Sequence, residues 1–171
     1  MGFPIEKFKG IKTPFYYYDT ALLDATLDAI KKELLPGYHM HYAVKACTNP
    51  TVLKHIAEAG LGCDCVSGGE IQACLNAGFK AEDIVFAGVG KSDWEINLGL
   101  EKDIFCFNVE SIPELEVINQ MAGERSKVAR VSFRINPNVG AHTHANITTG
   151  LAENKFGIDM KDMVKVIRLA Q

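Results

Sequence analysis

The spacing of hydrophobic and polar positions changes back and forth along the chain. Short runs that are apolar or alternate with period two predict strands, and the segments between them carry apolar positions at helical spacing. A short aromatic run adds one further predicted strand before the first helix. The predicted strands cover residues 15–18, 39–46, 63–66, 84–87, 104–107 and 128–135.

Residues suited to helix capping stand between the predicted strands. Four of the helical patterns follow residues of this kind. These residues are Asp19 or Thr20, Asn49 before Pro50, Ser92 or Asp93, and Ser111 with Glu114. A long polar segment, residues 137–154, separates the last predicted strand from a terminal amphipathic helix. The predicted helices end near residues 35, 59, 77, 100, 122 and 170.

The alternation of the two patterns gives about five successive β-α units, which predicts a parallel sheet with right-handed crossovers. An open doubly wound sheet and a (β/α)8 barrel both fit this order. Polar residues recur on the strand faces that would point inward, and this favours the barrel. A complete barrel needs roughly 250 residues. We therefore expect residues 1–171 to be one α/β domain, the N-terminal portion of a TIM-like barrel truncated before closure.

Lys45 stands at the carboxyl end of the predicted strand 39–46. Strand alternation places it on one face with His39, His41 and Ala43, and leaves apolar residues for the other face. A lysine held in a partly desolvated site loses proton affinity and becomes a usable amine nucleophile, as a Schiff base to pyridoxal 5′-phosphate requires. Strand-end lysines also occur as ordinary surface residues, so position alone leaves both readings open.

Asp64 lies between Cys63 and Cys65 in the next strand. Alternation puts both thiols on one face, packed against helices, and turns Asp64 toward the interior. The thiols have no CxxC partner spacing, so we expect no metal site. A carboxylate facing the interior needs a cation or hydrogen-bond donors.

Arg134 ends the strand 128–135 on the same face as Arg130 and Ser132. An interior arginine could serve a function, or it could simply neutralise an interior aspartate. Three strands that bring Lys45, Asp64 and Arg134 to one rim are more informative than any one of them, because catalytic residues of such barrels gather there.

Other motifs carry less weight. Gly68 and Gly69 lie at a strand-to-helix turn that could favour an anion, although the segment is not a GxGxxG motif. The stretch from residue 88 to 92 resembles the end of a P-loop, but Val85 stands where its first glycine should be. His142 and His144 lack further metal-binding partners and fit a loop for substrate closure or subunit contact.

Composition narrows the class of protein. The 171 residues are 47% hydrophobic with a net charge of -3 and no long basic run, which gives no support for nucleic-acid binding. No apolar run is long enough for a membrane span. Five cysteines without a secretory signal at the start predict reduced thiols in a cytoplasmic protein.

Four motifs together resemble the diaminopimelate decarboxylase family, a branch of the alanine-racemase-like, fold-type III enzymes that use pyridoxal phosphate. Their order along the chain is that of the family, and the resemblance runs from about Thr13 to the end. The motifs are YAVKA at residues 42–46, DCVSGGE at 64–70, FRINP at 133–137 and TTGLAENKFG at 148–157.

The resemblance implies that Lys45 is the catalytic residue that attaches pyridoxal phosphate and can later return a proton to the substrate carbon. It implies that Asp64 and Arg134 line the cofactor pocket, and that Glu70 and Lys155 occupy motif positions. The family removes CO2 from a small amino acid, meso-diaminopimelate, to give L-lysine, and works as a homodimer.

Two departures from the family affect these expectations. Cys47 follows Ala46 where the family usually has asparagine, and the later motifs, including the glycine-rich phosphate loop, are missing. We therefore expect the 171 residues alone to bind the cofactor poorly and not to turn over. An ornithine- or arginine-type decarboxylase, a racemase, and a non-catalytic pyridoxal-phosphate-binding protein of the same fold remain open as alternatives.

Overall fold

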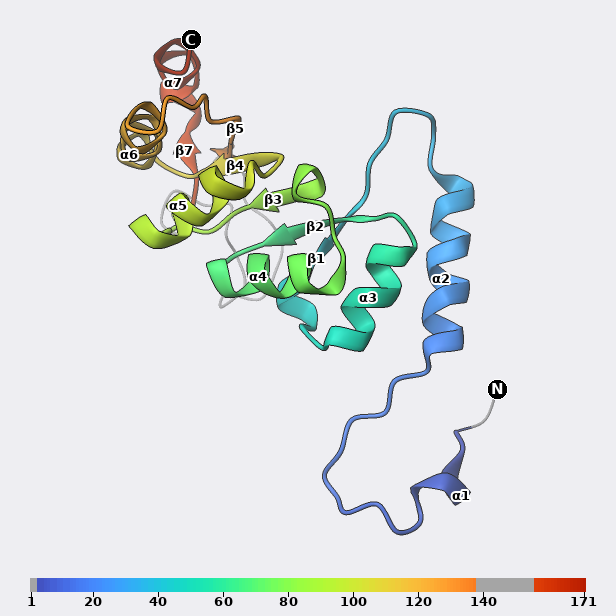
Figure 1. Ribbon diagram of the computed structural model, residues 1–171. Coiled ribbons are helices and arrows are strands. Elements are labelled where there is room, and N and C mark those ends of the chain that lie inside the picture. The colour runs from blue at the N-terminus through green and yellow to red at the C-terminus, as the bar shows by residue number, and fades with distance from the viewer. Residues whose placement is uncertain (1–2, 138–155) are drawn as a thin grey trace.

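The computed structural model describes residues 3–137 and 156–171, and its centre is a parallel sheet in the order β1-β2-β3-β4-β5 (Figure 1). A second parallel pair, β6 with β7, continues from the end of β5. The strands are β1 His41–Ala43, β2 Gly62–Cys65, β3 Ile84–Phe86, β4 Cys106–Val109, β5 Val131–Phe133, β6 Ile135–Asn136 and β7 Ile158–Asp159.

Four helices begin at predicted capping residues, which are Asp19, Asn49, Ser92 and Ser111. The Asp19 carboxylate accepts a hydrogen bond from the N–H of Leu22 at 3.0 Å, and the Asn49 side chain accepts one from the N–H of Thr51 at 3.0 Å. None of the helices in the described part of the chain has the length and apolar character needed to cross a bilayer. The α-helices are α1 Ile5–Phe8, α2 Thr20–Glu33, α3 Pro50–Glu58, α4 Gly68–Ala77, α5 Asp93–Lys102, α6 Ile112–Gly123 and α7 Met163–Leu169, and the short 3-10 helices are η1 Val44–Ala46, η2 Ala81–Asp83 and η3 Met160–Asp162.

The predicted β-α order is confirmed, but the predicted strand at residues 15–18 is wrong. These aromatic residues belong to no strand and lie on the long segment that leads into α2, away from the sheet (Figure 1). Aromatic residues favour strands only where a neighbouring strand is available to pair with them.

Several strand boundaries also differ from the prediction. The lysine strand ends at Ala43, and Lys45 lies on the 3-10 helix η1 that follows it. Strand β4 begins at Cys106, two residues later than expected, and the strand predicted over residues 128–135 is divided between β5 and β6. Strand β7 was not predicted, because two residues are too few to show a period.

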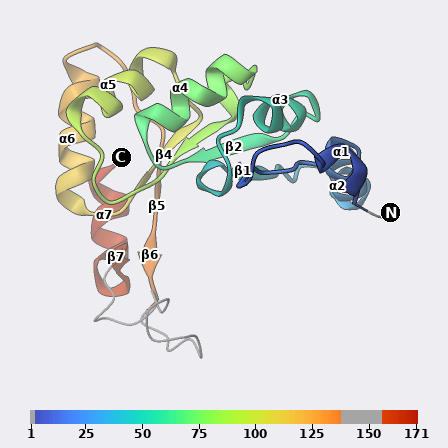
Figure 2. The ribbon, with the colours of Figure 1, turned by 90° about the horizontal axis from the view of Figure 1, so that it is seen from below.

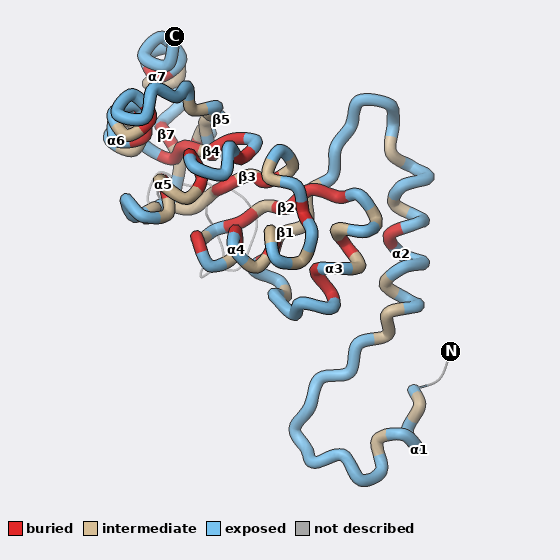
Figure 3. Tube along the Cα trace, viewed as in Figure 1, coloured by how far each residue is buried: buried red, intermediate tan, exposed pale blue. Residues whose placement is uncertain are grey.

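The two faces of the sheet have different surroundings. Helices α3, α4 and α5 lie along one face (Figure 2), and the strand residues on that side are buried (Figure 3). Register places polar groups on the opposite face, which those helices leave open. Helices on one face only are typical of part of a barrel wall, whereas a doubly wound sheet has helices on both. The buried side includes Cys63, Cys65, Ile84, Phe86, Phe107 and Val109, and the opposite face Ala43, Asp64, Val85, Cys106, Asn108 and Ser132.

Gly99 of α5 provides a test of the packing between helices and sheet. A methyl group at this position would lie 2.7 Å from the ring of Phe107 and 3.1 Å from the side chain of Ile104, both of which are buried. We expect Gly99→Ala to lower the free energy of unfolding by about 1–3 kcal/mol, because neither neighbour can move without repacking the core.

Gly123 of α6 is the matched control, because a methyl group there would meet nothing within 4 Å. Gly123→Ala should leave stability unchanged or raise it by up to about 1 kcal/mol, since alanine is the better helix former. Urea unfolding of both variants measures the difference. Equal stability of the two would show that the Gly99 contact can relax.

Candidate cofactor site

The parallel strands bring their carboxyl ends to one edge of the sheet, and Lys45 and Asp64 meet there. Ala43 of β1 pairs with Asp64 of β2, and Lys45 follows two residues later on η1. The charges of Lys45 and Asp64 interact, so the sequence prediction correctly brought these two together. Lys45 is exposed, in contrast to the partial desolvation that we expected.

Asp64 is held in an unusual state for an aspartate. Burial raises the pKa of its carboxyl above the ordinary value, and the nearby charges of Lys45 and His41 only partly oppose this effect. Its Oδ1 atom is buried and has no hydrogen-bond partner among the described residues. A buried acceptor without a donor is costly, so this oxygen fits a group that is not part of the described chain.

The raised pKa makes the stability of the cofactor-free protein depend on pH. A carboxyl that holds its proton more tightly in the folded state stabilises the fold fully below its unfolded pKa and loses this contribution as pH rises through the folded pKa. Asp64→Asn cannot ionise. We therefore expect the variant to be more stable than the unaltered protein at neutral pH and to lose this advantage in acid.

Urea unfolding at a series of pH values measures this difference. Asp28→Asn, which removes the charge of an exposed carboxylate on α2, is the control for the loss of a surface charge. A difference between Asp64→Asn and the unaltered protein that stays constant from acid to neutral pH would contradict the prediction.

A Ser-x-x-Glu pattern recurs at three successive strand-to-helix turns. The serine caps the helix, as in Ser67, Ser92 and Ser111, and the glutamate three residues later turns back to accept backbone N–H groups. The three glutamates are Glu70, which accepts from Val66 at 2.7 Å, Glu95, which accepts from Ser92 at 3.0 Å, and Glu114, which accepts from Glu110 at 2.8 Å.

The second and third glutamates also reach the preceding loop. The other Glu95 oxygen accepts the N–H of Gly68 at 2.7 Å, so this amide of the predicted anion-binding turn already has a partner. Glu95 is partly buried, but hydrogen bonds from Gly68 and Ser92 outweigh the burial and lower the pKa of its carboxyl. Glu114 likewise reaches the preceding loop, where its carboxylate accepts a hydrogen bond from the ammonium of Lys91.

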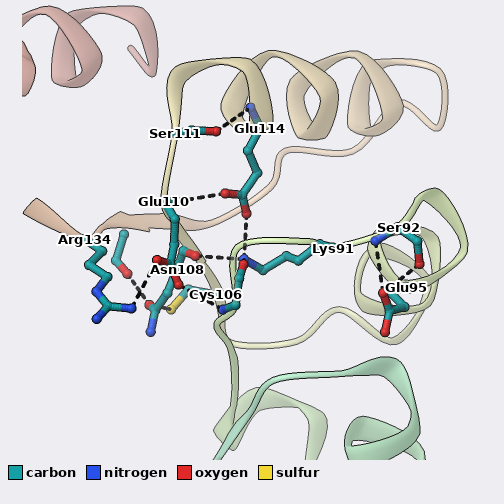
Figure 4. A network of polar contacts seen from close by, with 11 residues as sticks. Lys91, Ser92, Glu95, Cys106, Asn108, Glu110, Ser111, Glu114 and Arg134 are labelled. Atoms are coloured by element: carbon teal, nitrogen blue, oxygen red, sulfur yellow. Dashed lines mark hydrogen bonds and ion pairs between the residues drawn. The ribbon is translucent and has the colours of Figure 1, made fainter. Parts of the chain in front are cut away.

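Lys91, Glu114, Glu110 and Arg134 form a connected charge network (Figure 4). The Lys91 side chain is 1% exposed, and its Nζ lies 2.6 Å from Glu114 Oε1. It also donates to the carbonyl oxygens of Gly88 and Asn108 at 2.8 and 2.9 Å. Its three donors are therefore all paired, which a buried ammonium requires.

Glu110 connects this network to β5. Its carboxylate, in a side chain only 4% exposed, accepts the Gly88 N–H at 3.1 Å and pairs with Arg134 Nη1 at 3.1 Å. The Arg134 guanidinium also lies over the Phe156 ring, 5.5 Å from its centroid. Glu110 therefore fixes where Arg134 points.

The structure does not join Arg134 to Lys45 or Asp64 through any contact between described residues. Arg134 follows the fifth strand and Lys45 the first, so four strand spacings of about 4.8 Å separate them along the sheet. The carboxylate that neutralises Arg134 is Glu110, and Asp64 plays no part in this pairing. His142, His144 and Lys155 lie outside the described residues.

Sequence reasoning singled out neither Lys91 nor the bridging roles of Glu95, Glu110 and Glu114. The available signal was the Ser-x-x-Glu spacing at residues 67/70, 92/95 and 111/114, of which only the last pair was recognised as a capping box. Spacing could not show which loop each carboxylate would reach.

The edge around Lys45 fits pyridoxal phosphate. An exposed amine can bond the cofactor's aldehyde, and the unpaired Asp64 oxygen beside it can accept a hydrogen bond from the cofactor or balance its charge. The open face of the sheet leaves the Lys45 amine accessible. Arg134 and Glu110 lie further along the same edge.

Comparisons with known proteins point the same way. A family model described as "Pyridoxal-dependent decarboxylase, pyridoxal binding domain" matches residues 21–171. The diaminopimelate decarboxylase of Bacteroides thetaiotaomicron is 68% identical over 98% of this chain and 44% of its own length. That of Haemophilus influenzae is 47% identical over 92% of this chain and 38% of its own length. The chain therefore spans less than half the length of these curated relatives.

Solved structures show the same similarity. The diaminopimelate decarboxylase of Helicobacter pylori complexed with L-lysine aligns with a TM-score of 0.89 and 44% identity, over 96% of this chain and 42% of that one. The enzyme from M. jannaschii, also complexed with L-lysine, aligns with a TM-score of 0.82 and 36% identity, over 97% and 40%. A viral arginine decarboxylase at 22% identity shares the fold alone.

Proposed function

Because the chain belongs to the pyridoxal-dependent decarboxylases, as part of their pyridoxal-binding barrel domain, we propose that its whole protein removes CO2 from meso-diaminopimelate to give L-lysine. The observation that carries the proposal is the Lys45 amine beside Asp64, whose buried oxygen has no hydrogen-bond partner in the described part of the chain. The 68% identity to a diaminopimelate decarboxylase supports the substrate.

In this proposal Lys45 is the catalytic residue, and Lys45, Asp64 and Arg134 hold the cofactor. The bound pyridoxal phosphate supplies an electron-withdrawing ring that accepts the charge left when CO2 departs. Lys45 would hold the cofactor through its aldehyde, and its Nζ would supply the proton that returns to the substrate carbon. Asp64 accepts a hydrogen bond through Oδ1. Glu110 orients the Arg134 guanidinium at the opposite end of the edge.

The test uses the complete product of the native gene with pyridoxal phosphate. CO2 release is measured separately with meso-diaminopimelate, ornithine and arginine as substrates. We expect release from meso-diaminopimelate with L-lysine as product. Faster release from ornithine or arginine would favour the polyamine-type alternative, and a protein that binds the cofactor but releases no CO2 would favour the non-catalytic one.

We also propose that the complete protein is a cytoplasmic homodimer. All five cysteines of this chain are free, which agrees with a reducing compartment. Light scattering on the complete protein gives its mass in solution. A monomer that is fully active would contradict the dimer.

A further inference from the structure

Three cysteine thiols lie together on the helix-covered side of the sheet, opposite Asp64. Cys63 and Cys65 come from β2, and Cys74 comes from α4. The Cys65 sulfur lies 3.8 Å from the Cys63 sulfur and 3.8 Å from the Cys74 sulfur. All three residues are 0% exposed, and all three sulfurs lie within 4.8 Å of one another.

These distances suit a single atom bonded to all three sulfurs. Three sulfurs at about 2.3 Å from a trigonal-pyramidal central atom are separated by about 3.4 Å, and around a planar or tetrahedral atom by about 3.8–4 Å. To hold a pyramidal atom, the two 3.8 Å separations would shorten by about 0.4 Å and the third by at most about 1.4 Å. Sequence spacing alone argued against such a site, because Cys74 stands nine residues beyond Cys65 and only the packing of α4 on β2 brings it into place.

The composition of the cluster limits which atom it can hold. Among the described residues the group contains three sulfurs and no histidine or carboxylate, so a tetrahedral zinc ion would lack its fourth ligand. Charge also argues against zinc and copper. Three thiolates would leave a Zn²⁺ site with a net charge of about -1 and a Cu⁺ site with about -2, and a buried charge without a partner is strongly unfavourable. Trivalent arsenic bonded to three sulfurs is neutral.

We propose that Cys63, Cys65 and Cys74 form a binding site for trivalent arsenic, supplied as arsenous acid. Three As–O bonds break and three As–S bonds form, and each hydroxide leaves with one thiol proton as water. No oxidation or reduction takes place and no charge remains in the core. The site would link β2 covalently to α4.

Hydrogen bonds within the cluster shift the pKa values of two of its thiols in opposite directions. Hydrogen bonds to Cys63 and Cys74, followed by burial, raise the pKa of Cys65, and hydrogen bonds from Cys63 and Cys65 lower the pKa of Cys74. Because the thiols are buried, the reagent enters through local opening, and binding should be slow.

The test adds sodium arsenite to the complete, reduced protein, removes excess reagent by gel filtration and measures bound arsenic by intact mass. X-ray absorption at the arsenic edge then reports the bonded atoms. We expect one arsenic per chain with three sulfur neighbours and no oxygen. Arsenic that keeps oxygen neighbours, or none retained by the native protein, would overturn the proposal.

Variants locate the site independently of decarboxylase activity. Cys74→Ala should lose the three-sulfur signature, and Cys106→Ala, which removes a buried thiol on the opposite face, should keep it. Cys63→Ala should also lose the signature, which guards against a folding defect in one variant, and circular dichroism checks that each is folded. A folded Cys74→Ala that still binds arsenic through three sulfurs would place the site elsewhere.

Discussion

Lys45→Ala should abolish covalent retention of pyridoxal phosphate and lower turnover by at least about 10²–10⁴-fold, the contribution typical of a positioned proton donor. Loss of the amine that we propose binds the cofactor's aldehyde adds to this effect, because both proposed roles fall on the same nitrogen. Asp64 remains in place, so weak non-covalent binding of the cofactor can persist.

Borohydride reduction followed by peptide mapping gives a direct measurement. In the unaltered protein the pyridoxyl group should appear on the peptide that contains Lys45, and in the variant it should be absent. Lys54→Ala is the matched control, because Lys54 is an exposed lysine of α3 that pairs with the exposed Glu58 at 3.7 Å. A labelled Lys45→Ala protein with normal turnover would mean that another lysine holds the cofactor.

Lys91→Met should lower the free energy of unfolding by about 3–5 kcal/mol, the range found when one partner of a buried ion pair is removed. Methionine fills a similar volume but leaves Glu114 and the carbonyl oxygens of Gly88 and Asn108 without their donor. The carboxylate of Glu114 would then be a nearly buried charge with no cation beside it.

Urea unfolding of the complete protein measures the loss. Lys102→Met is the matched control, because Lys102 pairs with the exposed Glu101 at the surface, and its removal should change stability very little. Adding Glu114→Gln to Lys91→Met should recover part of the loss by removing the unpaired charge. If Lys91→Met and Lys102→Met unfold alike, the buried network does not stabilise the fold.

The order of strands and helices was predictable from the sequence. An element that buries one face repeats its apolar residues with the period of a strand or of a helix, so the period identifies the element. The helix starts at Asp19 and Asn49 were also predictable, since capping is a contact between neighbours in the chain. Residues 15–18 show that local composition alone does not make a strand. Their aromatic composition favours a strand, but the chain offers them no strand to pair with.

The candidate site was predictable to the extent that strand order fixes which residues meet. Asp64 and Lys45 lie on adjacent parallel strands or just beyond them, so alternation sufficed to bring them together. The partner of Arg134 was not predictable in this way. Glu110 lies on the loop after β4, and only the path of that loop decides that it, and not Asp64, pairs with the guanidinium.

The cluster of buried thiols was also only partly predictable from the sequence. Cys63 and Cys65 were correctly expected to share a buried face, because alternation requires it. The third sulfur comes from a helix, and the rotation of α4 about its own axis decides whether Cys74 faces the strand. That rotation depends on packing of the whole helix, and no local pattern encodes it.

The loop-to-loop glutamates have a consequence for how the protein emerges from the ribosome. The N–H of Gly68 is paired by Glu95, 27 residues later, and the ammonium of Lys91 by Glu114, 23 residues later. At a synthesis rate of roughly 5–20 residues per second, each loop waits about 1–5 s for its partner. The loops after β2 and β3 are therefore each completed by the next β-α unit made, and this part of the nascent chain can become ordered stepwise from its N-terminal side.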